Sequence, residues 1–221
     1  MKSDSSIPIK VLTSVWEGDD TSFLDAALEF YPLQPVQRIL DCTINEGRFW
    51  KGSHFRDKVT GMDINPDHCS DIVGDNRIMA TVKDATFDVI VYDPPHVPNQ
   101  GRDQQKDFCR RFGLGGKAGK ETAYSFIHDY RLVAIQAHRV LKPGGLLLAK
   151  VIDYVHNHRY HWALFDLVQA IQMVGMTPCD LVIKVRQGPM IDPKWKTQHH
   201  ARRRHAYWLI ARNSSRCERR A

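Results

Sequence analysis

The sequence predicts an α/β protein with a doubly wound, mostly parallel sheet in a single domain. Seven short β-prone runs occur along the chain, and helical stretches lie between several of them, most clearly at 122–140 and 160–174. Strands that alternate with helices form parallel sheets, because the helix carries the chain back for the next strand. At 221 residues, one domain with a sizeable core is favoured over two small domains.

The predicted elements follow in a regular order. A helix is expected at 19–31, capped by Thr21 or Ser22, before strands in the runs at 36–42, 59–64, 71–75, 87–93, 144–152, 180–185 and 206–212. The segment between Asp63 and Asp75 is too short for a crossover helix, so a turn is expected there. No helix separates the last two runs, which predicts an antiparallel last strand at the sheet edge.

The ends and the composition predict the organisation of the chain. Residues 1–14 are expected to form a flexible arm, 15–212 the folded domain and 213–221 a disordered basic tail. No apolar run approaches the roughly 20 residues that cross a bilayer, and the start lacks a secretory signal. The five cysteines are scattered without a C-x-x-C pair, which fits a reducing cytoplasm. The eleven histidines lack partners at ligand spacing, so no metal site is predicted.

The net charge of +6 is distributed unevenly. Residues 97–120 hold six Lys and Arg against two acids, and residues 184–221 hold eleven against two, so the rest of the chain is acidic. This distribution favours a polyanionic partner that meets the protein at particular loops. Nucleic acid is therefore the expected partner, although the tail alone reads as solubilising.

The run "DVIVYDPPH" at 88–96 ends a β-prone stretch with an acid, two prolines and a histidine. Proline lacks an N–H and has a fixed φ, so two prolines end a strand abruptly. This can be a simple strand stop with Asp93 as a turn residue. It can also be a rigid ledge that holds Asp93 and His96 for chemistry.

The first and second strand ends carry candidate cofactor residues. "RILDCTINEGRFW" enters a turn with Asn45 and Gly47, two residue types that tolerate positive φ. Asp63 ends the second strand, where an acid can accept hydrogen bonds from ribose hydroxyls or can merely cap the next turn. The first turn lacks a phosphate-binding glycine pattern, and its acids Asp41 and Glu46 would repel a pyrophosphate. They suit a cofactor with an ammonium or sulfonium group, which points to S-adenosylmethionine.

Several motifs occur in an order typical of one enzyme family. "ILDCTINEG", "GMDIN", "GDN", "DPPH" and "RVLKPGGLLLAKV" resemble successive motifs of class I S-adenosylmethionine-dependent methyltransferases, in the branch that methylates amino groups. "DDTSFL" resembles the segment that contacts the methionine part of the cofactor in many DNA amino-methyltransferases. The resemblance covers roughly residues 15–212. It implies a Rossmann-like sheet of seven strands and S-adenosylmethionine as the cofactor.

The resemblance also implies site residues. The cofactor-binding residues carried over from the motifs are Thr21, Asp41, Thr43, Asn45, Gly47, Asp63, Ile64, Asp75 and Asn76. The catalytic residues are Asp93, Pro94, Pro95 and His96. The sequence departs from the family pattern at Asn45, where a glycine is usual, and at His96, where an aromatic residue is usual.

The chemistry implied at the tetrapeptide is activation of an exocyclic amine. Such an amine is a poor nucleophile, because its lone pair delocalises into the ring. The Asp93 carboxylate and the Pro94 carbonyl could accept its two hydrogens and free the lone pair, with proline aiming the carbonyl in advance. His96 would stack on the base or receive the leaving proton.

The basic segments 97–120 and 187–204 are predicted to border the active site as substrate loops. Their candidate substrate-binding residues are Arg102, Lys106, Phe108, Arg110, Arg111, Lys117, Lys120, Arg202, Arg203 and Arg204. Adenine N6 in DNA is the first expectation, while cytosine N4 and an RNA amino group stay open. No region of domain size is left for reading sequence, so a second copy or a specificity subunit could supply it. The other readings are methylation of a glutamine amide in a protein and a non-catalytic nucleic-acid-binding module.

Overall fold

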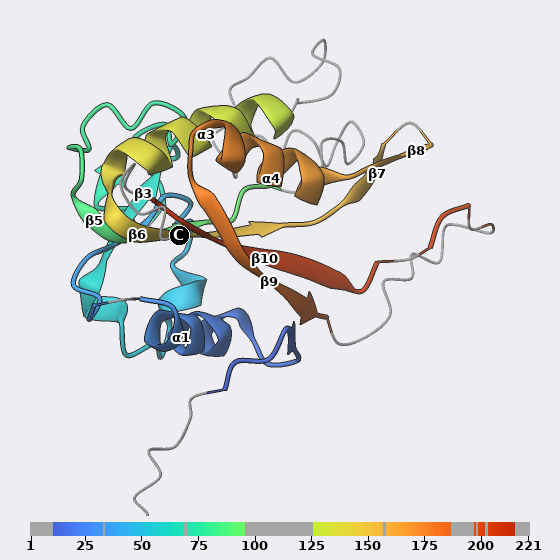
Figure 1. Cartoon of the computed structure of the whole chain (residues 1–221), viewed down its shortest axis with the longest axis horizontal. Coiled ribbons are helices and arrows are strands. Elements are labelled where there is room, and N and C mark those ends of the chain that lie inside the picture. The colour runs from blue at the N-terminus through green and yellow to red at the C-terminus, as the bar shows by residue number, and fades with distance from the viewer. Residues whose placement is uncertain are drawn as a thin grey trace, which may run out of the picture.

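The computed structural model describes residues 11–32, 34–68, 70–95, 126–156, 158–186, 197, 199–201 and 203–214. The strands are β1 (Val15–Trp16), β2 (Ile39–Asp41), β3 (Val59–Asp63), β4 (Ile72–Val73), β5 (Phe87–Tyr92), β6 (Leu141–Val151), β7 (Tyr154–His156), β8 (Arg159–His161), β9 (Thr177–Val185) and β10 (His205–Arg212). The helices are α1 (Asp20–Phe30), α3 (Phe126–Val140) and α4 (Ala163–Met173), with 3-10 turns η1 (Arg48–Trp50) and η2 (Arg56–Lys58). Together they form a layered α/β structure (Figure 1).

The main sheet has eight strands in the order β1-β9-β10-β6-β5-β2-β3-β4. Strands β6, β5, β2, β3 and β4 are parallel to their neighbours along this row. Two predictions need correction. The sheet has eight strands instead of seven, because Val15–Trp16 pairs in parallel with β9 as an additional edge strand. The antiparallel strand β10 lies between β6 and β9, so it is an interior strand and not an edge strand.

Helices cover both faces of the sheet. α3 and α4 lie on one face and α1 lies on the other (Figure 1). The core beneath α1 includes the fully buried side chains Phe23 and Trp208, whose rings stack with centroids 5.2 Å apart. Burial of apolar area on both faces explains why the strands read as nearly continuous apolar runs.

The capping residue of α1 differs from the prediction. Its N-cap is Asp19, whose side chain accepts a hydrogen bond of 2.7 Å from the backbone N–H of Ser22. Thr21 and Ser22 therefore lie within the first helical turn and do not cap it. An aspartate satisfies a free N–H of the first turn and also complements the positive end of the helix dipole.

The chain between β6 and α4 also differs from the prediction. Residues expected to begin a helix at 160 instead form the second strand of a hairpin, β7–β8, and α4 begins at Ala163. The described residues of the short connection from Asp63 to β4 form turns and no helix, as predicted. Among the described helices, none is long and apolar enough to span a bilayer.

The topology sets the position of the site. β2 pairs with β5 on one side and with β3 on the other, all in parallel. The carboxyl ends of β2, β3, β4, β5 and β6 therefore share one edge of the sheet. In doubly wound sheets, ligands bind outside this edge, at the point where the strand order reverses.

Candidate active site

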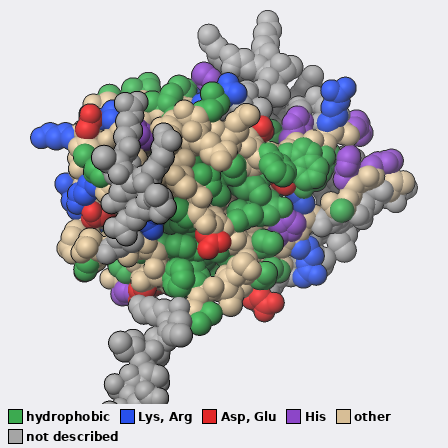
Figure 2. Space-filling model, in the orientation of Figure 1, with side chains coloured by type: hydrophobic (Ala, Val, Ile, Leu, Met, Phe, Trp, Pro, Cys, Tyr) green, Lys and Arg blue, Asp and Glu red, His purple; other side chains and the backbone are tan. Residues whose placement is uncertain are grey.

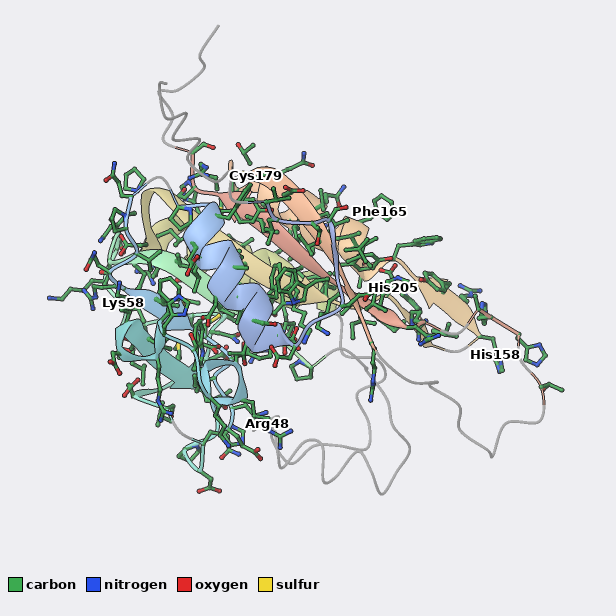
Figure 3. All side chains as sticks on the ribbon, turned by 90° about the horizontal axis from the view of Figure 1, so that it is seen from below. Arg48, Lys58, His158, Phe165, Cys179 and His205 are labelled. Atoms are coloured by element: carbon green, nitrogen blue, oxygen red, sulfur yellow. The ribbon has the colours of Figure 1, made fainter. Side chains whose placement is uncertain are left out.

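A pocket of about 740 Å³ runs along the carboxyl edge of the sheet. Its volume is within the range of small-molecule sites. The charged residues that line it are Asp20, Glu46, Arg48, Asp63, Asp75, Arg77, Asp93, Asp129, Lys150, Asp153, Lys184, Arg186 and Arg203. Figure 3 labels two lining residues: Arg48, in η1 after β2, and His205, the first residue of β10. The pocket thus combines acidic and basic groups in one cavity.

The turns after β2 and β5 are joined directly. The backbone N–H of Asp93 donates a 2.8 Å hydrogen bond to the Thr43 hydroxyl, and the N–H of Cys42 donates one of 3.0 Å to the carbonyl of Val91. Asn45 in the first turn has φ of 49°, the left-handed conformation that asparagine tolerates. The turns after β2 and β5 are therefore locked together at the switch point.

Asp41 lies beneath the first turn and does not line the pocket. One carboxylate oxygen accepts a 2.7 Å hydrogen bond from the indole N–H of Trp50, and the other accepts one of 3.0 Å from the backbone N–H of Thr43. Complete burial raises the pKa of Asp41 to about 7, opposed by these hydrogen bonds and assisted by the charge of Asp93. Its role is to shape the turn.

Asp63 organises the end of β3 and lines the pocket. Its Oδ2 accepts a 3.0 Å hydrogen bond from the backbone N–H of Asn45, and its Oδ1 accepts one of 2.9 Å from that of Asn65. The Nδ1 of His68 lies 3.0 Å from Oδ2. This one carboxylate therefore holds the first turn and the second turn in fixed positions beside the pocket.

The turn after β4 contributes a second acidic group. The Asp75 carboxylate accepts hydrogen bonds of 2.6–3.1 Å from the Arg77 guanidinium, which also reaches Asp129 at 3.3 Å. Burial tends to raise the pKa of Asp75, but the hydrogen bonds and charge of Arg77 lower it overall. The Asn76 amide donates a 3.0 Å hydrogen bond to the carbonyl of Cys42 and so joins this turn to the first.

The Asp93 side chain faces a largely buried lysine. Lys150, near the end of β6, places its Nζ 2.8 Å from Asp20 Oδ2 and 3.8 Å from Asp93 Oδ2. The ammonium also lies over the rings of Phe49 and Trp208, at 5.0 and 5.6 Å from their centroids. Burial tends to lower the pKa of Lys150, but Asp93 and Asp20 raise it overall. The lysine therefore stays protonated beside the Asp93 carboxylate.

The far end of the pocket is basic. Lys184 and Arg186 come from the carboxyl end of β9, and Arg203 and His205 come from the start of β10. A backbone hydrogen bond of 2.7 Å from the N–H of Arg186 to the carbonyl of Arg204 joins the two strands here. The pocket therefore runs from acids over β2–β4 to cations over β9 and β10.

The structure brings most of the described predicted residues together. Pocket-lining residues include Thr43, Asn45, Asp63, Ile64, Asp75, Asn76, Asp93, Pro94, Pro95 and Arg203. Thr21, Asp41, Gly47 and Arg204 do not line it. His96, Arg102, Lys106, Phe108, Arg110, Arg111, Lys117, Lys120 and Arg202 lie outside the described residues.

Several lining residues were missed by the sequence analysis, among them Asp20, Lys150, Asp153, Tyr154 and Lys184. Lys150 and Asp153 had a usable signal, because they follow the apolar run of β6 at the same edge as Asp93. Asp20 is one residue from the predicted Thr21, so the segment was identified and the residue was not. Among the described residues, no cluster of His, Cys, Asp or Glu is arranged to hold a metal ion.

No protein-family model and no curated protein matches this chain. A solved candidate methyltransferase from Bacillus halodurans is 13% identical with a TM-score of 0.55, covering 90% of this chain and 100% of that one. TrmN from Thermus thermophilus is 15% identical with a TM-score of 0.53, covering 87% of this chain and 48% of that one. A candidate DNA modification methylase from Thermus thermophilus, complexed with S-adenosyl-L-methionine, is 20% identical with a TM-score of 0.45.

The last comparison covers 64% of this chain and 54% of that methylase, so this chain spans about half of its length. Identities this low establish a shared fold, whereas activity has to be argued from the site itself. The two structures with TM-scores above 0.5 share the fold of this chain, a mostly parallel mixed sheet with helices on both faces. The chain therefore has the fold of class I methyltransferases.

Proposed function

We propose that this protein is an S-adenosylmethionine-dependent methyltransferase that acts on an exocyclic amino nitrogen of a nucleobase, with adenine N6 in DNA as the first choice. The observation that carries the proposal is the 2.8 Å hydrogen bond from the Asp93 N–H to the Thr43 hydroxyl. It holds the Asp93–Pro95 turn rigidly against the first turn of the pocket. A fixed acceptor next to a cofactor-sized cavity is the arrangement that amine activation requires.

The residues at the acidic end of the pocket fit S-adenosylmethionine. Asp63 would accept the ribose hydroxyls, while Ile64, Asp75 and Asn76 would hold the adenine. The Oδ1 of Asn45 is buried and has no hydrogen-bond partner among the described residues, so it can accept from the ammonium of the methionine part. When bound, the cofactor supplies a methyl group on a positively charged sulfur. Acids outnumber cations at this end, which suits that charge.

The acceptors of the Asp93–Pro95 turn suit an amine better than a hydroxyl. The Asp93 carboxylate and the Pro94 carbonyl provide two acceptors, and an –NH2 group has two hydrogens to donate. Hydrogen bonds to both would draw the lone pair out of the ring and aim it at the methyl carbon. Lys150, 3.8 Å from Asp93, favours the ionised carboxylate that accepts most strongly.

The basic end of the pocket supports a nucleic-acid substrate. Lys184, Arg186 and Arg203 lie at one edge of the sheet with the reacting turn. Cations at this position can bind the phosphates on either side of the target nucleotide. The target base would have to leave its duplex or be unpaired in order to enter the pocket.

The test is methyl transfer from labelled S-adenosylmethionine to duplex DNA, single-stranded DNA, RNA and protein extract. We expect Asp93→Ala to lower transfer at least about 100-fold, because an essential acceptor is lost, while cofactor affinity measured by calorimetry stays unchanged. Asp84→Ala is the control, since this exposed carboxylate pairs with Arg139 away from the pocket.

Each outcome assigns the function. Undiminished transfer by Asp93→Ala would overturn the proposed mechanism. Transfer to protein alone would instead favour methylation of a glutamine amide. Cofactor binding without transfer to any substrate would favour a non-catalytic binding module. Identification of the modified base then distinguishes adenine N6 from cytosine N4.

A further inference from the structure

An exposed aromatic cluster lies outside the pocket, on the β7–β8 hairpin and the start of α4. Trp162 is 58% exposed and Phe165 is 66% exposed. Their rings are in contact, with centroids 5.9 Å apart, and Trp162 also packs on Tyr160 at 4.6 Å. We call these three residues the aromatic platform. Exposing a contiguous group of large apolar rings to water is unfavourable in free energy. Such a group on a protein surface therefore indicates a binding surface.

Positive and imidazole side chains surround the aromatic platform. The guanidinium of Arg203 lies over the Tyr160 ring, 5.7 Å from its centroid, and the ring of His200 is within 3.2 Å of the carbonyl of His158. Residues 154–165 and 197–207 contain no acid, and the acids that border them are Asp153, which accepts from the Tyr160 hydroxyl, and Asp166. Figure 2 shows hydrophobic side chains bordered by histidine and by Lys or Arg on this part of the molecule, and Figure 3 labels Phe165 and His158 there.

The aromatic platform is continuous with the pocket. The Tyr160 hydroxyl donates a 3.2 Å hydrogen bond to Asp153, which lines the pocket, and Arg203 belongs to both surfaces. The Nη1 of Arg203 is buried and has no hydrogen-bond partner among the described residues. A buried guanidinium donor that lacks an acceptor is suited to a phosphate oxygen.

We propose that the aromatic platform binds unpaired DNA next to the base held in the pocket, with bases stacked on Trp162 and Phe165 and a phosphate on Arg203. Rings combined with cations are the arrangement that binds single strands, because every base has a flat face and every linkage a charge. An apolar protein partner would offer no negative charge to the surrounding cations, whereas DNA would. The inference rests on the proposed function, which supplies DNA as the substrate.

The test is fluorescence anisotropy with a short labelled single-stranded DNA of mixed sequence and the full chain. We expect Trp162→Ala combined with Phe165→Ala to raise Kd about tenfold or more. Met173→Ala is the matched control, because Met173 is equally exposed, at 66%, at the other end of α4. Arg203→Gln should reduce the slope of log K against log salt by about 0.7, the loss of one phosphate contact.

The outcomes separate this inference from the proposed function. The same titration is run on Asp93→Ala, which should bind DNA like the wild type while lacking transfer. Equal affinity of the double variant and the Met173→Ala control would overturn the platform and leave the proposed function intact. Platform-dependent binding without any transfer would support the platform and reject the function. Preference for RNA or duplex DNA, or loss of self-association in the double variant, would overturn unpaired DNA as the occupant.

Discussion

The two ends of the pocket are built in different ways. At the acidic end, Asp63 accepts backbone hydrogen bonds from the first turn and from its own turn, and Asp75 accepts one from the N–H of Arg77 in its own turn, so each carboxylate holds backbone in place. At the basic end, Lys184, Arg186 and Arg203 come from two antiparallel strands and the chain that joins them. The acidic end is therefore preorganised by hydrogen bonds between and within its turns, whereas the basic end is formed by cations at the adjoining ends of two paired strands.

The contrast fits two different ligands. A small cofactor of constant shape gains most from donors and acceptors that are already in place, because binding then costs little ordering. A polymer with a repeating charge is bound by cations that need only approximate positions. Asp93 and Lys150 lie where the two ends meet, on the adjacent strands β5 and β6.

The largest effect is expected at this junction, for Lys150→Met. Removing the ammonium leaves Asp20 and Asp93 without their shared cation, which should lower the free energy of unfolding by about 3 kcal/mol. Transfer should also fall, and its decline on the acid side should move to higher pH because a cation no longer favours the ionised carboxylate. Urea denaturation and pH–rate profiles measure these effects.

The control is Lys142→Met. Lys142 lies in β6, as Lys150 does, but at the end away from the pocket, where it forms an ion pair with Asp88 of β5. This variant should keep the pH profile of the wild type. A Lys150→Met profile that coincides with the wild type would show that Lys150 does not act on Asp93.

The acidic end is tested by Asp63→Ala. The variant loses the acceptor for two backbone N–H groups and for the ribose hydroxyls, and hydrogen bonds to charged acceptors contribute about 1.5–3 kcal/mol each. S-adenosylmethionine should therefore bind at least about tenfold more weakly by calorimetry, with no change in DNA affinity. Asp67→Ala, an exposed carboxylate in the same turn, is the control. If Asp63→Ala lowered the affinities for the cofactor and for DNA equally, the two ends of the pocket would not bind separate ligands.

The last prediction concerns the pH dependence of stability, with no effect expected on ligand selectivity. Because the pKa of Asp41 rises from its ordinary value of 3.8 to about 7 on folding, the folded state holds this proton more tightly. Its contribution is fully present below about pH 4 and is lost as the pH rises towards 7. The slope amounts to at most about 1.4 kcal/mol per pH unit.

Asp41→Asn cannot ionise, so the wild type should lose stability relative to the variant steadily between pH 4 and pH 7, and the difference should stay constant above pH 7. Chemical denaturation at a series of pH values measures the difference. A constant difference across the whole range would mean that Asp41 is already ionised in the folded protein.

The strand ends of the acidic half could be predicted because their signals are local. Asp63 follows an apolar run directly, and Asn45 stands where the turn needs a residue that tolerates positive φ. Their neighbours in the fold are also close in sequence, since β2, β3 and β4 lie within residues 39–73. Local patterns of this kind survive in the sequence because the backbone itself requires them.

Other features carry no such signal. Strand β1 has two residues, too few for any periodicity, and it exists because β9 offers it an open edge. The hairpin β7–β8 mixes aromatic residues with histidines, and such a run can be read as a helix. The antiparallel pairing of β7 with β8 fixes it as two strands.

The sequence by itself determined the class of the fold and the acids and prolines at the ends of its central strands. These follow from periodicity and from the backbone limits of proline, glycine and asparagine. Only the tertiary structure decided that Lys150 meets Asp20, 130 residues away, and that Asp41 turns inwards to Trp50. Such contacts depend on how distant strands pack, because desolvation and ion pairing act through space and leave no pattern along the chain.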